Sequence, residues 1–212
     1  MQIELGNTTA LLLPEKAMFL PEHGILVIAD LHLGKAMHFR KAGLLVPPGS
    51  AHKDYQVLHD LLLQYQPQEV WFLGDLFHST YNSEWQQLEA LIRTYADVRF
   101  TLIQGNHDIL QADHYDRLHI RVIPEALVLE ELIFSHEPFA NPAAGKINIA
   151  GHIHPGCLLR GLGRQSLRLP CFYFRDNLFL LPAFGALTGL HMMTQGSTVT
   201  IFPIASGRVL LL

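Results

Sequence analysis

Histidine, aspartate and asparagine side chains recur in this sequence directly after short apolar runs. Two pairs, Asp30-Leu31-His32 and His152-Ile153-His154, have an i, i+2 spacing, which places both polar side chains of a pair on one face of an extended segment. Carboxylate, imidazole and amide donors without a thiolate suit Mn, Fe, Zn or Co better than Ca or Mg. The pattern therefore predicts a transition-metal site, with these candidate ligands: Asp30, His32, Asp75, Asn106, His136, His152 and His154.

Seven candidate ligands are too many for one ion, because some coordination positions must stay open for water. They fit two ions about 3.5–4 Å apart that share a bridging carboxylate, and such a pair generates hydroxide near neutral pH and holds a phosphoryl group for in-line displacement. A single histidine or aspartate at a strand end is more often a structural residue or a helix cap. Independent capping does not explain seven such residues in five segments, so we interpret them as one site.

The apolar runs that precede these residues are typical of buried strands, and they cover residues 25–29, 70–74, 100–103, 132–135 and 147–151. Apolar residues at helical spacing predict one helix over 50–65 and another that begins at Ser83, with Ser83 as its N-cap. The alternation of strand and helix predicts a parallel sheet in this half. Ligands of such sheets bind outside the carboxyl ends of the strands, where the candidate ligands lie.

The chain after His154 is rich in predicted strands. Runs at 172–174 and 178–181 flank Arg175-Asp176-Asn177, which indicates a hairpin, and 199–204 and 209–212 read as closing strands. We expect antiparallel pairing here. The whole pattern, with short N-terminal strands, predicts an α/β fold: a four-layer-like sandwich of two facing mixed β-sheets flanked by helices, in one domain over residues 1–212.

Composition excludes several classes of protein. With 212 residues, 49% of them hydrophobic and 16% charged, the chain can bury a full core and is not disordered. We expect no membrane span and no secretory signal, because the apolar runs are short and the start of the chain is neither basic nor apolar. Two cysteines without a CxxC pair favour a reduced, cytoplasmic setting. A net charge of -4 does not indicate a nucleic-acid partner, although it leaves room for a local basic patch, and the 15 basic residues form no stripe that would mark a DNA groove.

The candidate ligands and their neighbours resemble the pattern of the calcineurin-like metallophosphoesterase superfamily. That pattern is D-x-H, G-D, G-N-H-[DE], H and G-H-x-H, and all five elements occur here in this order between residues 30 and 154. The segments 29–35, 39–43, 151–155 and 182–189 further resemble the ligase-associated DNA damage response endonuclease family (PdeM), and Gly74-Asp75-Leu76-Phe77-His78 is similar to repair nucleases of the SbcD type. This resemblance implies a Mn-dependent phosphodiesterase or DNA endonuclease in DNA repair, with a functional link to a DNA ligase and a helicase. Fe or Zn are alternative metals.

The resemblance also implies roles for single residues. Asp30, His32 and His154 would hold one ion, Asp75 would bridge, and the second ion would be held by Asn106, His136 and His152. His107 would be the catalytic acid that protonates the leaving oxygen. Many superfamily members place an aspartate three residues after the bridging carboxylate to orient this histidine, and here that residue is His78. Asp108 is another candidate for orienting His107, and Lys35 and Arg40 are candidate substrate-binding residues in what could equally be a solvated loop.

The leading hypothesis is hydrolysis of phosphodiester bonds in DNA by a metal-bridging hydroxide. One alternative is a phosphodiesterase or phosphatase that acts on a small nucleotide. Another is a non-catalytic scaffold of the same fold, although such scaffolds tend to lose ligands or the acid histidine, and none is lost here. The segment 182–189 is either a loop that lines the site or a plain turn after a strand.

Overall fold

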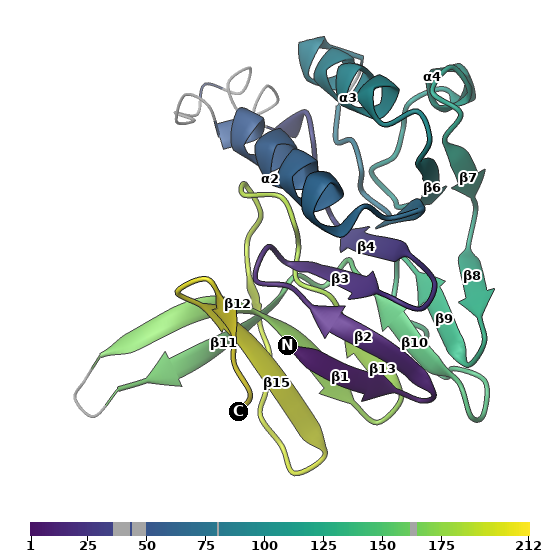
Figure 1. Ribbon diagram of the computed structural model, residues 1–212. Helices are drawn as coiled ribbons and strands as arrows, with labels where there is room; N and C mark the ends of the chain where they lie inside the picture. Colours follow the sequence, from purple (N-terminus) through teal and green to yellow (C-terminus); the bar gives the residue numbers. More distant parts are fainter. Residues whose placement is uncertain (36–42, 44–49, 80, 162–164) are drawn as a thin grey trace.

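The computed structural model describes residues 1–35, 43, 50–79, 81–161 and 165–212, and it contains two β-sheets that face each other (Figure 1). The first sheet has seven strands in chain order: β1 (Gln2–Leu5), β2 (Thr8–Leu12), β3 (Ala17–Leu20), β4 (Ile25–Ala29), β5 (Glu69–Leu73), β6 (Arg99–Ile103) and β7 (Arg121–Ile123). Strands β1 to β4 pair antiparallel, whereas β4 to β7 are parallel. The predicted parallel arrangement of β4, β5 and β6 is confirmed.

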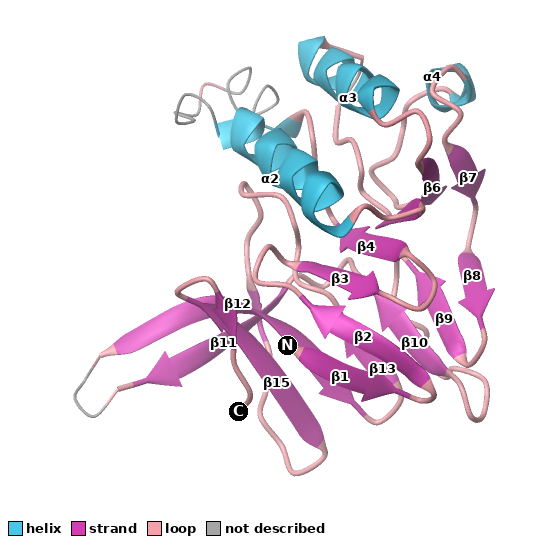
Figure 2. Ribbon diagram, viewed as in Figure 1, coloured by secondary structure: helices cyan, strands magenta, loops and turns pink. Residues whose placement is uncertain are grey.

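The described helices cover the outer face of the first sheet (Figure 2). They are α2 (Ser50–Tyr65), α3 (Ser83–Thr94) and α4 (Ala112–Asp116). Leu58, Trp85 and Tyr115, one from each helix, pack in a single apolar cluster with residues of the sheet. The predicted bounds of α2 are confirmed. The predicted N-cap of α3 is wrong, because Asn82 has the extended backbone and its side chain accepts a hydrogen bond of 2.8 Å from the N–H of Glu84, which places Ser83 inside the helix.

The second sheet has the strand order β14-β11-β12-β13-β10-β9-β8, and β15 pairs with β12 and β16. Its strands are β8 (Ala126–Leu129), β9 (Leu132–Ser135), β10 (Ile147–Ala150), β11 (Pro155–Arg160), β12 (Ser166–Arg175), β13 (Leu178–Leu180), β14 (His191–Met192), β15 (Val199–Ala205) and β16 (Arg208–Val209). The predicted hairpin of β12 and β13 is confirmed.

The expectation of antiparallel pairing after His154 is confirmed where β12 pairs with β11, β13 and β15. It is wrong for β14, which is parallel to β11, and for β13, which is parallel to β10 and with β9 and β10 forms the parallel centre of this sheet. Parallel neighbours require a connection that returns the chain to the end of the sheet where the previous strand began. Residues 136–146 make this connection between β9 and β10, and the segment that contains β11 and β12 makes it between β10 and β13. The fold is thus an α/β sandwich of two mixed sheets.

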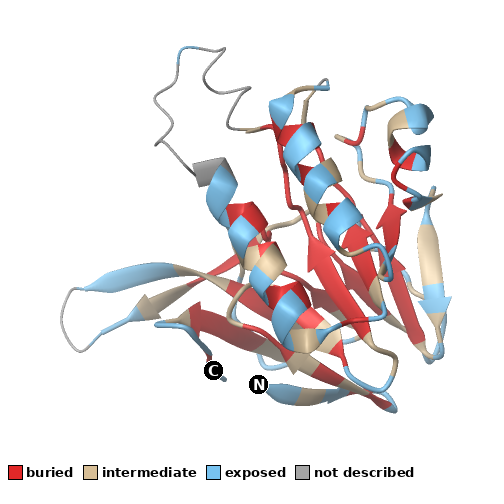
Figure 3. Cartoon of the chain, turned by 45° about the horizontal axis from the view of Figure 1, so that its top comes forward, coloured by how far each residue is buried: buried red, intermediate tan, exposed pale blue. Residues whose placement is uncertain are grey.

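Most residues of the central strands of both sheets are buried (Figure 3). Apolar side chains from both sheets fill the space between them. Val27 and Trp71 of the first sheet belong to one cluster with Phe134 and Phe179 of the second, and the rings of Trp71 and Phe134 meet edge to face with centroids 4.9 Å apart. All residues of β4 are buried, because helices cover one face of the strand and the second sheet covers the other. None of the described helices is long and apolar enough to cross a membrane.

Candidate metal centre

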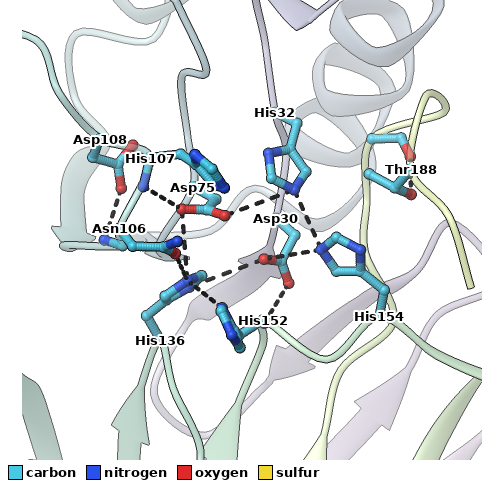
Figure 4. Close-up of polar contacts among 12 residues, drawn as sticks. Asp30, His32, Asp75, Asn106, His107, Asp108, His136, His152, His154 and Thr188 are labelled. Carbon is cyan, nitrogen blue, oxygen red and sulfur yellow. Dashed lines mark hydrogen bonds and ion pairs between the residues drawn. The ribbon is translucent and has the colours of Figure 1, made fainter. Parts of the chain in front are cut away.

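The seven predicted ligands lie together at the carboxyl ends of five strands, three from the first sheet and two from the second (Figure 4). Asp30 and His32 follow β4, and Asp75 and Asn106 lie shortly after β5 and β6. His136 follows β9, and His152 and His154 follow β10. Because the sheets face each other with these ends at the same side, residues far apart in the sequence reach one centre.

Asp30, His32 and His154 form a group whose ligand atoms all lie within 4.8 Å of one another. Nε2 of His154 lies 3.2 Å from Nε2 of His32 and 3.4 Å from Oδ1 of Asp30. Burial, aided by the charge of Lys35, lowers the pKa of His32 to about 2, so its imidazole is neutral and its lone pair can bind a metal. This group has the composition predicted for the first ion.

The second group surrounds Nε2 of His136. Nδ1 of the same ring lies 3.0 Å from the carbonyl oxygen of Leu73, which assigns the proton to Nδ1 and leaves the lone pair on Nε2. That Nε2 lies 3.1 Å from Oδ1 of Asn106, 3.1 Å from Nδ1 of His152 and 3.5 Å from Oδ1 of Asp75. The structure therefore brings the four residues expected around a second ion to one point.

The carboxylate of Asp75 lies between the two groups. Its Oδ2 is 3.8 Å from Nε2 of His32, and its Oδ1 is 3.5 Å from Nε2 of His136. The backbone N–H of His107 also donates to Oδ1, at 3.0 Å, which fixes the direction of the carboxylate. Each oxygen faces a different group, so this one carboxylate is placed to contact both.

Five of the seven ligands have a left-handed backbone that is uncommon for residues other than glycine. The φ angles are 53° at Asp30, 49° at His32, 50° at Asp75, 65° at His152 and 55° at His154. Each such residue costs about 1–3 kcal/mol and persists only where neighbouring contacts hold it, which is typical of functional sites. Here the N–H of His32 donates to the carbonyl of Asp75 at 2.8 Å, and the N–H of His152 donates to Oδ2 of Asp30 at 2.8 Å.

Gly74 and Gly151 let the turns of the site approach one another. Gly74 has a φ of 71°, and a Cβ atom there would lie 2.2 Å from Nδ1 of His136. A Cβ atom at Gly151 would lie 2.6 Å from Oδ2 of Asp30. Any side chain at these positions would displace a candidate ligand.

His107 is half-buried beside the first group, with its ring centroid 6.0 Å from that of His32. The ring of His78 packs against it at a centroid distance of 3.9 Å. The carboxylate of Asp108 accepts hydrogen bonds from the N–H groups of Gly105 at 2.9 Å and Phe77 at 3.2 Å. It therefore holds the turn that carries His107 against the loop after β5, and burial raises its pKa to about 6.

Lys35 lies close enough to the centre for the charges of two candidate ligands to act on its ammonium group. Partial burial lowers the pKa of Lys35, while the carboxylates of Asp75 and Asp30 act in the opposite direction, which places its ammonium group within their electrostatic influence. Arg40, the other candidate substrate-binding residue, lies outside the described residues.

The segment 182–189 after β13 supports the first turn of the site. The N–H of Phe184 donates to the carbonyl of Ala29 at 2.9 Å, and the N–H of Gly185 donates to the carbonyl of Asp30 at 3.2 Å. This segment is therefore more than a plain turn, because it holds the backbone on which Asp30 stands.

Two charged residues that the sequence analysis did not single out fix this segment. Nζ of Lys16 donates to the carbonyl of Phe184, and Asp54 accepts the N–H of Ala186 at 3.1 Å. Burial lowers the pKa of Lys16 to about 8 and raises that of Asp54 to about 6. No local motif marks them, because they come from the turn before β3 and from α2 and meet the segment only in the folded chain.

The donor set fits divalent cations. Asp30 is fully buried, Asp75 is 2% exposed, and Oδ1 of Asp30 has no hydrogen-bond partner among the described residues. Two buried carboxylates are costly without compensating positive charge. Neutral imidazoles add lone pairs rather than charge, so the cluster is suited to bind cations.

Comparison with known proteins agrees with this geometry. Residues 23–172 match the family described as Calcineurin-like phosphoesterase. The chain belongs to this family. Family members use divalent metal ions. The groups that could hold an ion here are Asp30 with His32 and His154, and Asp30 with Asp75 and His136.

Among solved structures, the crystal structure of the Pseudomonas putida nuclease MPE is similar over 100% of this chain and 99% of that one, with a TM-score of 0.85 and 32% identity. The phosphoesterase Yfce from E. coli matches 87% of this chain and 95% of its own, with a TM-score of 0.45 and 15% identity. No curated protein sequence matches. The family and the nuclease support a hydrolase that acts on phosphoester bonds.

Proposed function

We propose that this protein is a phosphodiesterase with two divalent metal ions, most suitably Mn, and that it is an endonuclease acting on DNA. The observation that carries the proposal is the position of Asp75, whose two oxygens face the two groups of candidate ligands at 3.8 Å and 3.5 Å. The similarity to a nuclease over the whole chain supports the choice of substrate.

The chain supplies two sets of donors in this proposal. Asp30, His32 and His154 hold one ion, Asn106, His136 and His152 hold the other, and Asp75 contributes to both. When bound, such a pair activates water near neutral pH and neutralises charge on the phosphoryl group. The contact of His136 Nδ1 with the Leu73 carbonyl keeps the ring oriented with its other nitrogen toward the site.

His107 is the proposed general acid. Its backbone N–H is fixed on Asp75, and its imidazole lies beside His32, so it can donate a proton to the leaving oxygen of the substrate. Packing against His78 restrains the ring. Lys35, which lies within the field of both carboxylates, would contact a substrate phosphate, and we extend that role to Arg40.

We also propose a role in DNA repair, together with a DNA ligase and a helicase, on the basis of the resemblance to the ligase-associated DNA damage response endonuclease family. A cytoplasmic location is supported by the two cysteines, Cys157 and Cys171, which are buried and unbridged.

Closed circular DNA tests the proposal, because only an endonuclease can cut a molecule without ends. Protein loaded with Mn is incubated with circular single-stranded DNA and supercoiled duplex, and in parallel with cyclic nucleotides and an aryl phosphodiester. We expect cutting of at least one circle, no cutting with a chelator, and none by the Asp75→Asn variant. Cleavage of the small diesters alone would favour the small-nucleotide alternative, and no cleavage at all would favour a scaffold.

The metal content tests the other half of the proposal. Elemental analysis should find up to two Mn, Fe or Zn ions per chain, and anomalous scattering should place them at the named ligands. A single ion bound elsewhere in fully loaded protein would contradict the dinuclear site.

A further inference from the structure

A cavity of about 400 Å³ opens beside the second group of ligands. Its lining includes Asn106 and His136, so two candidate ligands of the second group form part of its wall. Its volume lies within the range of about 300–1,000 Å³ that is usual for small-molecule sites. A group attached to a phosphate at the centre could therefore extend into it.

One wall of the cavity presents an aromatic ring to solvent. Phe139 lines the cavity and is 38% exposed. Exposed aromatic rings beside a nucleic-acid site are platforms on which bases stack, and the contact tolerates any base because every base has a π-face.

The position of Phe139 is fixed by a buried side chain. Oδ1 of Asn148, which is fully buried, accepts the N–H of Phe139 at 2.7 Å. Nδ2 of Asn148 donates to Ser135 Oγ at 2.9 Å, and that hydroxyl donates to the carbonyl of Glu137 at 2.7 Å. The segment between His136 and Phe139 is thus tied to β9 and β10, which holds the ring at a set distance from the candidate ligand.

The charge of the cavity indicates which part of a nucleotide it accepts. Glu125 and Glu137 line it and are exposed. Two carboxylates repel a second phosphate, and they accept hydrogen bonds from amino groups. The chemistry therefore suits a neutral ring that carries an amino group.

We propose that this cavity is a base-binding subsite, in which the base of the nucleotide joined to the scissile phosphate stacks on Phe139 and directs its amino group to Glu125 and Glu137. The subsite rests on the proposed phosphodiesterase function and deepens it. Cytosine, adenine and guanine carry an exocyclic amino group and thymine does not, so thymine is the disfavoured base.

Two diesters that share one leaving group test the subsite. Deoxycytidine 5′-(p-nitrophenyl phosphate) carries a base, and methyl p-nitrophenyl phosphate does not. Phe139→Ala should raise KM for the nucleoside ester by about 5–100-fold, which corresponds to the usual contribution of one stacked base, and leave kcat/KM for the methyl ester unchanged. Phe139→Tyr should restore the KM. Tyr81→Ala is the control, because Tyr81 is an aromatic residue that is 44% exposed and lies outside the cavity lining. It should leave KM and kcat/KM unchanged for both esters.

The amino-group preference has its own comparison. Wild-type protein should show a lower KM for the deoxycytidine ester than for the thymidine ester, and Glu125→Ala combined with Glu137→Ala should remove that difference, because both hydrogen-bond acceptors are lost. Equal effects of Phe139→Ala on the nucleoside and methyl esters, or no effect on either, would overturn the subsite while leaving the phosphodiesterase function intact.

Failure of the function itself gives a different result, because wild-type protein would then cleave neither ester. The Phe139→Trp variant decides the subsite even in that case. Stacking of deoxycytidine 5′-monophosphate should quench the added indole fluorescence in Mn-loaded protein, relative to the same titration of wild type. Absence of extra quenching up to millimolar nucleotide would overturn the subsite.

Discussion

The imidazole of His78 lies against the imidazole of His107, with ring centroids 3.9 Å apart and ring planes at 42°. His78 follows the bridging carboxylate Asp75 by three residues. The carboxylate of Asp108 is engaged with the backbone N–H groups of Gly105 and Phe77. In this chain, therefore, packing against a second imidazole restrains the proposed acid, and Asp108 acts on the backbone of the turn.

Replacement of the proposed acid should separate chemistry from metal binding. We expect His107→Ala to retain its metal and to lower kcat on DNA by about 10²–10⁴-fold, because a positioned general acid contributes by that factor. The loss on a nitrophenyl diester should be small, since nitrophenolate leaves without a proton. Kinetics on both substrates with metal analysis measure this.

Asp75→Asn is the contrasting variant. Loss of the bridging carboxylate should empty or disorder the pair of ions and abolish turnover of both substrates. If His107→Ala loses metal in the same way, or slows both substrates alike, His107 is structural and the acid assignment is wrong.

A methyl group at Gly74 should displace a ligand. Because a Cβ atom there would lie 2.2 Å from Nδ1 of His136 at a φ of 71°, we expect Gly74→Ala to lower the free energy of unfolding by about 2–4 kcal/mol and to weaken metal binding. Gly145→Ala is the matched control, with a φ of 74° and nothing within 4 Å. It should cost only the backbone strain of about 1 kcal/mol and leave metal binding unchanged. Equal losses in the two variants would show that contact with His136 is unimportant.

The free energy of unfolding should depend on pH through the protonation of Asp54. Burial raises the pKa of Asp54 to about 6 in the folded chain, against about 3.9 in an unfolded one. The folded state therefore binds the proton more tightly, and the stabilising contribution of Asp54 is complete below pH 4 and is lost as pH rises through 6. The free energy of unfolding of wild type minus that of Asp54→Asn should increase from pH 7 to pH 4, by at most about 1.4 kcal/mol per pH unit. Chemical denaturation of both metal-free proteins measures this difference, and a flat difference would contradict the shift.

The proposed phosphate contact of Lys35 should appear in the salt dependence of DNA binding. Lys35→Ala should weaken DNA binding and make the fall of log K for DNA binding with log salt concentration less steep by about 1. It should have little effect on hydrolysis of a small aryl diester. Lys146→Ala is the control, because Lys146 precedes β10 and thus stands at the opposite end of that strand from His152. Arg40→Ala should act like Lys35→Ala. Equal loss on DNA and on the small diester would remove the DNA-specific role of Lys35.

The sequence by itself determined which residues could form the site and where they stand relative to strands. The polar residues after runs such as 25–29 and 147–151 mark strand ends. A strand buried on both faces is apolar along its length, so polar residues follow only where the strand leaves the core. The parallel order of β4, β5 and β6 also followed, since the helical segments between them require crossovers.

Only the tertiary structure decided how these residues combine. The parallel pairing of β9, β10 and β13 depends on long connections, whose course no local pattern records. The support of Asp30 by segment 182–189, and of that segment by Lys16 and Asp54, joins parts of the chain separated by more than a hundred residues. The division of the two oxygens of Asp75 between His32 and His136 likewise arises from the packing of two sheets, because burial and side-chain direction are properties of the folded chain and not of residue spacing.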